Sequence, residues 1–328
     1  MNPAFSVLFL TTLIGAGQGL FMTLHALEWF GGAAPAGGDR GLYVLGGALA
    51  LVLTAGGLVA SFFHLGRPER AWRTATMWRT SWLSREVIVL PLFMLGVAVW
   101  TWLHLTSGAG TRVPGLVTSV LSLALFICTA MIYASVRFIQ EWASAYTLVN
   151  LTLMGLASGA TLAAALAGVH SPVLVPPLAL AALVLTFAAL VGRALSLRRN
   201  ARLVPRSTLQ SAIGIRHPVL RQRSMGFMGG SFNTREFFHG RSTGTLRWVL
   251  WVAIALGFVL PMAALAVVGL GGFTGTTGAT GTKSVTGATS AVLLAAAALV
   301  QMAGLLAERW FFFAQANHPQ NLYYQAVS

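Results

Sequence analysis

The sequence has little charge, and acidic residues are especially scarce. Only 9% of its 328 residues are charged, and 21 Lys and Arg residues outnumber seven Asp and Glu residues. Soluble domains carry about 25% charged residues, whereas 56% of this chain is hydrophobic. This composition excludes an ordinary soluble domain and indicates an integral membrane protein. The excess of basic residues is then better explained by membrane topology than by a groove for nucleic acid.

Cysteine is also nearly absent. Cys128 is the single cysteine, and it lies within an apolar run. One thiol cannot form an internal disulfide, and an iron–sulfur cluster needs several thiolate ligands. Any redox chemistry in this chain must therefore use a group other than cysteine.

Long apolar runs, by contrast, are plentiful. A membrane-spanning helix needs about 20 mostly apolar residues, and unbroken runs of this length can satisfy their backbone in lipid only as helices. The sequence predicts an all-α fold, a single polytopic membrane domain with a bundle of eight transmembrane helices. The predicted spans are about 5–30, 42–64, 86–106, 114–136, 147–169, 172–196, 247–270 and 289–312.

The positions of the basic residues between these spans predict the orientation. Arg40, Arg112 and Lys283 fall on one side, and all the other Lys and Arg residues are assigned to the opposite side. Those others include Arg193, which we assign to the loop after the sixth span. The positive-inside rule makes the basic side cytoplasmic, and both termini lie on that side.

Two cytoplasmic loops, about 65–85 and 195–246, are much longer than the usual connection of about 4–6 residues. Within the second, 224–241 reads SMGFMGGSFNTREFFHGR and has four phenylalanines. Exposed aromatic surfaces mark interfaces, which predicts docking of a soluble partner. A signal for orientation combined with contacts to anionic lipid is the alternative. The predicted docking residues are Arg70, Arg73, Arg79, Phe232, Arg235, Glu236, Phe237 and Phe238.

The first long loop is bounded by a histidine and a glutamate. His64 ends the second span and Glu86 opens the third, so the two side chains could meet at the cytoplasmic membrane boundary. Each has a simpler explanation: His64 could bond a backbone carbonyl, and Glu86 could offset the helix dipole with Ser84 as N-cap. Together they suit quinol chemistry, because imidazole and carboxylate can exchange protons with a quinol hydroxyl. The predicted supporting residues are Arg67, Arg85, Trp72 and Trp82, although the tryptophans also fit an interfacial amphipathic helix.

Two other classes of membrane protein remain as alternatives. His25 and His104 fall near the external ends of their spans and could ligate a haem, as in a haem-b cytochrome. A secondary transporter usually needs a buried acid near the midplane, and no acid falls at the middle of a predicted span. Gln18 is interpreted as an interhelical hydrogen-bonding residue, and Glu308 is expected to pair with the adjacent Arg309.

The stretch FHLGRPERAW, followed by TSWLSRE, resembles the signature region of the dimethyl sulfoxide reductase membrane-anchor subunit family. That family includes the related anchors of sulfite-oxidising molybdoenzyme complexes. The N-terminal run FSVLFLTTLIGAGQGLF, the segment GFMGGSFNTREFFHG and the eight spans also fit, so the resemblance covers most of the chain. The long arginine-rich loop after the sixth span departs from the family pattern and is more similar to the sulfite-oxidising branch.

This resemblance implies a multi-pass subunit of the bacterial inner membrane that is not itself the catalytic subunit. It would hold a four-cluster, ferredoxin-like iron–sulfur subunit and, through it, a molybdopterin subunit that oxidises sulfite or reduces an S-oxide. The chain would exchange electrons between those clusters and the pool of menaquinone or ubiquinone. The quinone-site histidine and glutamate of the family match His64 and Glu86. No haem, iron–sulfur cluster or other metal site is expected in this chain.

Overall fold

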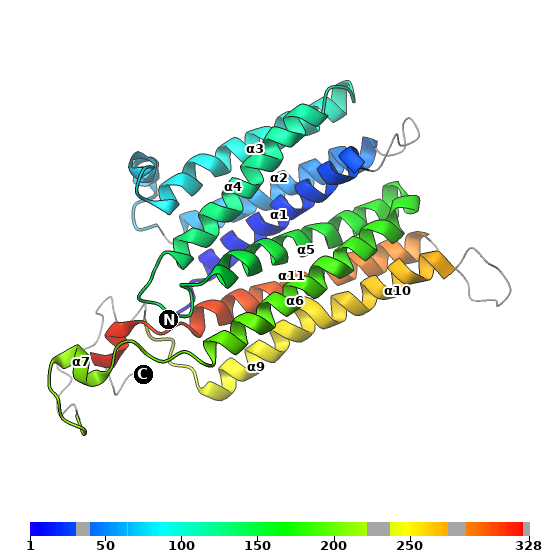
Figure 1. The fold of residues 1–328 in the computed structure, drawn as a ribbon. Helices are drawn as coiled ribbons and strands as arrows, with labels where there is room; N and C mark the ends of the chain where they lie inside the picture. Colours follow the sequence, from blue (N-terminus) through cyan, green and yellow to red (C-terminus); the bar gives the residue numbers. More distant parts are fainter. Residues whose placement is uncertain (31–39, 64, 222–236, 275–286, 324–328) are drawn as a thin grey trace.

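The computed structural model describes the chain except for residues 31–39, 64, 222–236, 275–286 and 324–328. In the described part, eight helical segments are long and apolar enough to cross a membrane, which confirms the predicted all-α bundle (Figure 1). The first six spans are α1 (Phe5–Phe30), α2 (Arg40–Phe62), α3 (Trp82–Thr106), α4 (Arg112–Ala134), α5 (Ala145–His170) and α6 (Val175–Asn200), the last preceded by the short helix η2 (Pro172–Leu174).

The seventh span is composite. It consists of α9 (Thr243–Ile254), one π-helical turn η3 (Ala255–Val259) and α10 (Leu260–Thr274), and the eighth span is α11 (Gly287–Ala314). The π-helical turn comes just before Pro261, whose backbone nitrogen has no hydrogen to donate to the usual helical hydrogen bond. The turn accommodates this missing bond without ending the helix. The short helices outside the spans are η1 (Pro68–Met77), α7 (Leu209–Ile213) and η4 (Pro319–Tyr323).

Helices α1 and α5 pack against each other at the centre and join α2–α4 to the remaining helices (Figure 1). Small residues allow this contact, because a Cβ added at Gly159 would fall on the backbone of Gly19. Gly257 and Gly304 make a similar close approach between η3 and α11. The core around α1 and α3 is filled by large apolar side chains, including Phe21 and Trp100, both fully buried.

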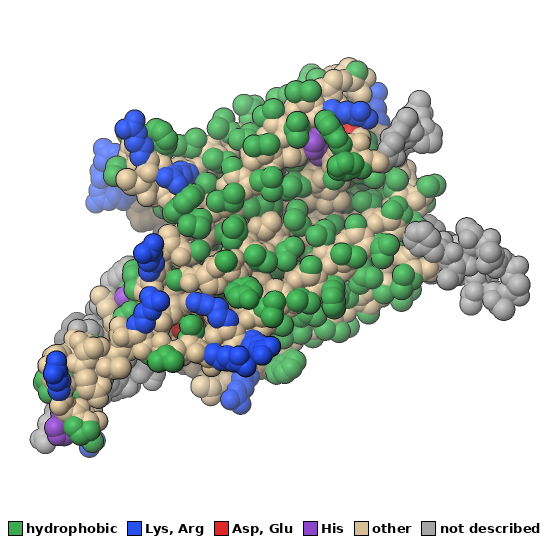
Figure 2. Space-filling model, viewed as in Figure 1, with side chains coloured by type: hydrophobic (Ala, Val, Ile, Leu, Met, Phe, Trp, Pro, Cys, Tyr) green, Lys and Arg blue, Asp and Glu red, His purple; other side chains and the backbone are tan. Residues whose placement is uncertain are grey.

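The two ends of the bundle differ in charge. Figure 2 shows Lys and Arg side chains gathered where η1 and α7 lie, while hydrophobic side chains cover the sides of the helices. We call the end that carries η1, α7, η4 and the N-terminus the basic end (Figure 1). The opposite, far end carries Arg40 and Arg112 at the starts of α2 and α4. The distribution agrees with the charge asymmetry predicted from the sequence.

Several helix boundaries differ from the predicted ones, and two of the differences bear on the candidate sites. Helix α3 begins at Trp82, one turn before the predicted start, because the side chain of Ser81 caps it and accepts from Ser84 N (3.3 Å). The expectation that Ser84 is the N-cap is therefore wrong. Helix α6 continues to Asn200, beyond the predicted end at about 196, and Arg193, which the predicted span already included, belongs to this helix and not to the loop. The arginine is only 2% exposed, and its assignment to a cytoplasmic loop is also wrong.

Candidate functional site

Glu86 is buried near the start of α3 and is 7% exposed. Its Oε1 accepts a hydrogen bond of 2.5 Å from Thr129 Oγ1 of α4. Within the described residues, Glu86 has no ion pair with an Arg, Lys or His side chain. An ionisable residue at membrane depth without a cation is costly, which makes it a candidate for function.

The carboxyl of Glu86 faces the interior of the bundle. It lines a small cavity together with Thr11 and Gln18 of α1, Thr129 of α4 and Leu151 of α5. The cavity measures about 10 Å³, which is room for about one water molecule. The Glu86 carboxyl therefore has polar neighbours on α1 and α4, and it lies near the end of the bundle at which α3 begins.

The other predicted quinone-site residues lie around the start of α3. Arg85 stacks over the Trp82 ring at 4.2 Å and donates to the carbonyl of Trp78 (2.9 Å), so its side chain turns toward η1. Arg67 is the N-cap of η1, and Trp72 within η1 is 66% exposed. His64 lies outside the described residues. The structure thus brings Arg85 and Trp82 together next to Glu86 and leaves Trp72 on the surface.

The predicted docking residues divide into two groups. Arg70, Arg73 and Arg79 are exposed at the basic end, and the last two lie over the rings of their neighbours Trp72 and Trp78 (5.6 and 5.4 Å). Arg70 pairs loosely with Glu69 at 3.9 Å. The second group belongs to the loop before α9, where Phe232, Arg235 and Glu236 lie outside the described residues.

The remaining two phenylalanines pack within the chain. The Phe237 ring stacks on His318 of the C-terminal segment, with centroids 3.9 Å apart, and Phe238 is 9% exposed. The carbonyl of Phe237 also accepts from the side chain of Asn321 (3.3 Å). The stacking and hydrogen bond of Phe237 therefore pack the end of this loop against the C-terminal segment.

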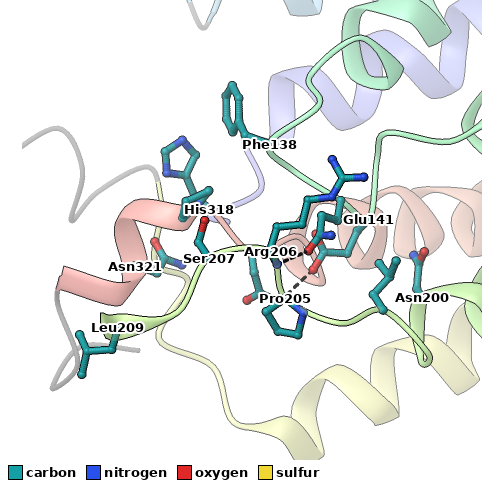
Figure 3. A pocket seen from close by; sticks show the side chains of 13 residues that line it. Phe138, Glu141, Asn200, Pro205, Arg206, Ser207, Leu209, His318 and Asn321 are labelled. Atoms are coloured by element: carbon teal, nitrogen blue, oxygen red, sulfur yellow. Dashed lines mark hydrogen bonds between the residues drawn. The ribbon is translucent and has the colours of Figure 1, made fainter. Parts of the chain in front are cut away.

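A cleft of about 520 Å³ opens at the basic end (Figure 3). It forms where the loop after α4, the segment after α6 and the C-terminal segment meet. Gln140 accepts from the backbone N–H of Arg206 (3.3 Å), and Asn317 donates to Glu141 (3.0 Å), so hydrogen bonds join the three segments. The walls combine charged, amide and aromatic side chains.

The N-terminus is part of this end of the molecule. The Met1 amine donates to the carbonyl of Ala316 (2.9 Å), and burial lowers its pKa to about 6 although nearby Glu141 opposes the shift. Burial also lowers the pKa of His318 and of His239, and the positive N-terminus lowers both further. The first residue and the C-terminal segment are therefore packed together outside the spans.

His25 and His104 lie near the far end of the bundle. His25 Nδ1 is 2.9 Å from Ser119 Oγ, and its Nε2 is 3.3 Å from the carbonyl of Arg112. The His104 ring stacks on Tyr43, and its Nε2 is 3.7 Å from Glu28 Oε1. An axial haem ligand needs a free imidazole nitrogen, and both nitrogens of His25 already have partners. This arrangement does not fit the haem-ligand role considered for His25.

A third polar cluster is not evident from the sequence. Glu308 of α11 is 2% exposed and lies 3.0 Å from Arg193 Nε of α6 and 3.4 Å from Arg309 Nη1. The expected pairing of Glu308 with Arg309 is confirmed, but Arg193 is an additional partner. The Arg193 guanidinium also stacks over the Phe311 ring at 5.6 Å.

The fold and these sites define a multi-pass membrane protein with polar groups inside its bundle and one strongly basic end. Residues 1–214 match the family described as DMSO reductase anchor subunit (DmsC), and the chain belongs to that family. It is 48% identical to a subunit of the sulfite dehydrogenase of Allochromatium vinosum over 343 aligned positions that cover 100% of both chains. It is also 29% identical over 148 residues to anaerobic dimethyl sulfoxide reductase chain YnfH of Escherichia coli, covering 44% of this chain and 51% of that one. The family resemblance seen in the signature stretch is thereby confirmed.

Proposed function

We propose that this chain anchors a molybdopterin and iron–sulfur oxidoreductase complex in the bacterial inner membrane and exchanges its electrons with the quinone pool. The observation that carries the quinone role is Glu86, a buried carboxyl without a cation partner among the described residues, next to the basic end. The full-length similarity to a sulfite dehydrogenase subunit favours sulfite oxidation in the catalytic subunit over S-oxide reduction.

The chemistry assigned to Glu86 is proton exchange with a quinone oxygen. Reduction of one quinone takes up two electrons and two protons, and oxidation of a quinol releases the same number. The electrons come from or return to a cluster of the iron–sulfur subunit. Glu86 would supply or accept a proton at the quinone oxygen, and His64 is its proposed partner. Arg85 and Trp82 would form the edge of the slot where a polar head group enters.

The basic end is the proposed docking surface for the iron–sulfur subunit. The exposed arginines of η1 and the cleft beside Arg206 are on this same end (Figures 1 and 3). Opposite charge on a partner would guide its approach and fix its register. A cluster docked there would be close to Glu86, as electron transfer between that cluster and a quinone requires. By the positive-inside rule this end is cytoplasmic.

Neutralising the docking arginines should release the partner. For the triple variant Arg70→Gln, Arg73→Gln and Arg79→Gln we expect roughly tenfold weaker retention, because exposed pairs contribute about 0.2–1 kcal/mol each. The measurement is the distribution of the iron–sulfur subunit between washed membranes and supernatant, at equal amounts of anchor. Arg112→Gln at the far end is the control and should retain the partner. Full retention by the triple variant would contradict docking through η1.

The proposed function is tested by purifying the complex from its native host in mild detergent. Molybdenum and iron that co-purify with this chain, together with sulfite-dependent quinone reduction and no Soret band, would support it. S-oxide reduction with the same metals would redirect the substrate assignment. A Soret band without molybdenum would instead favour the haem-b cytochrome alternative, and substrate flux by the chain alone would favour a transporter.

A further inference from the structure

A row of polar side chains runs through the bundle between α1, α3 and α4. Three interhelical contacts define it: Thr129 to Glu86 (2.5 Å), Ser122 to Gln18 (3.4 Å) and Ser119 to His25 (2.9 Å). The row ends at Glu28, near the far end. We call the following six residues the polar row: Glu86, Gln18, Ser122, Ser119, His25 and Glu28.

The gaps between these contacts are short. Glu86 and Gln18 line the same cavity of about 10 Å³, which has room for about one water molecule between its walls. Ser119 and Ser122 are three positions apart on α4, which places them side by side on one face, about 5–6 Å apart. His25 and Glu28 have the same spacing on α1.

The row covers nearly the full thickness of a membrane. Thr111, at the start of α4, donates to Glu28, and Thr129, eighteen positions later, donates to Glu86. At a rise of 1.5 Å per residue this separation is about 27 Å, close to the hydrocarbon thickness of about 30 Å. The row therefore joins the basic end to the far end.

The composition of the row suits proton transfer. Glu86, His25 and Glu28 can each take up and give back a proton, the serine hydroxyls between them can both donate and accept, and the Gln18 amide accepts through its oxygen and donates through its nitrogen. Gln18 and Ser122 are 1% and 0% exposed, so lipid and bulk water are excluded from the middle of the row. At the far end, Glu28 is held by Trp100 Nε1 (2.9 Å) and Thr111, and its side chain is still 10% exposed.

Interhelical hydrogen bonding alone is the simpler explanation, and the bundle contains such a case. Gln301 of α11 donates to Thr186 Oγ1 of α6 (3.2 Å), and it is as buried as Gln18, at 1% exposed. Among the described residues, no hydrogen bond extends that pair to an ionisable side chain. The polar row differs because its three contacts and the gaps between them align ionisable groups at both ends and in between.

We propose that the polar row conducts protons between Glu86 and the far face of the membrane. This proposal rests on the proposed function of Glu86 as the proton partner of quinone. The row itself is defined by the three observed contacts between helices. The two protons taken up when quinone receives two electrons from the iron–sulfur subunit would enter through the row. The two released when quinol is oxidised would leave by it. Quinone turnover would then move charge across the membrane.

The test uses the purified complex in proteoliposomes, with quinone turnover and transmembrane charge movement recorded together. For Gln18→Leu and Ser119→Ala we expect the charge moved per electron to fall at least about tenfold. The introduced leucine and alanine side chains can neither donate nor accept a hydrogen bond. Ser119→Thr keeps the hydroxyl and should behave as wild type. Gln301→Leu removes an equally buried interhelical bond and should keep the wild-type ratio.

Each outcome decides the inference. An unchanged ratio in Gln18→Leu and Ser119→Ala, or no charge movement by the wild-type complex, overturns it. If a row variant loses turnover altogether, passive proton flux under a potassium diffusion potential, without quinone, decides instead. Loss of that flux in Gln18→Leu but not in Gln301→Leu supports the path, and equal flux overturns it. Normal quinone turnover in Glu86→Gln would refute the site assignment and leave the path to be judged by the other variants.

Discussion

Glu86→Gln should lower quinone-coupled turnover by about 100-fold or more, since a positioned general acid or base contributes about 10²–10⁴ in rate. Glutamine has nearly the shape of glutamate, and its carbonyl oxygen can still accept the bond from Thr129. It cannot release or take up a proton in the physiological range. The variant should therefore fold, insert and hold its partners while the proton chemistry at the quinone fails.

Two activities of the same purified complex separate this loss from loss of assembly. Reduction of a quinone analogue requires the anchor, whereas reduction of a soluble dye by the catalytic and iron–sulfur subunits does not. We expect only the first to fall in Glu86→Gln and in His64→Ala. Glu69→Gln, a surface acid with its side chain 66% exposed, is the matched control and should keep both activities. Quinone reduction within about twofold of wild type in Glu86→Gln would refute the assigned proton role.

The spans and the basic end could be predicted from the sequence because they depend on local composition. Hydropathy over about 20 residues identifies a span, and the positions of arginines identify an end. Helix boundaries were less certain because they depend on single caps. At α3 the sequence suggested Ser84 as the cap, and the structure uses Ser81, three residues earlier.

The interpretation of Gln18 as an interhelical hydrogen-bonding residue is confirmed, but its partner could not be predicted in the same way. Gln18 and Ser122 are far apart in sequence, and nothing in one sequence says that their helices meet. A partial signal was present, because Thr11, Gln18 and His25 recur at intervals of seven on α1. Seven residues make nearly two helical turns, which places all three on one face. That face is the one that packs against α4, where Ser119 and Ser122 lie.

Arg193 was misassigned for a related reason. An arginine within a turn or two of the end of a span can extend to the membrane surface, so its sequence position is consistent with exposure. What buries it is Glu308, which belongs to a different span, α11. The carboxylate offsets the cost of a guanidinium in the interior, and only the packing of α6 and α11 on α5 brings the two side chains within reach of each other.

Removal of Glu308 is expected to have the largest effect on stability. Its carboxylate lies between two guanidinium groups, those of Arg193 and Arg309, and all three side chains are at most 6% exposed. Loss of one partner from a buried ion pair costs about 3–5 kcal/mol, because the remaining charge is left without compensation. That is a large share of the roughly 5–15 kcal/mol by which folded proteins are stable. For Glu308→Leu we therefore expect much less folded protein in membranes.

Combined variants distinguish this electrostatic cause from simple loss of packing. Arg193→Met should be milder than Glu308→Leu, because Glu308 then keeps Arg309 as a partner at 3.4 Å. The double variant should be more stable than Glu308→Leu alone, since it removes one of the two uncompensated charges. Thermal unfolding of the detergent-purified complex measures each effect, and Glu141→Gln at the basic end is the control. If the double variant were less stable than Glu308→Leu by the full cost of Arg193→Met, the two side chains would be energetically independent. Arg193 would then be held in the bundle by its packing against Phe311 and not by the carboxylate.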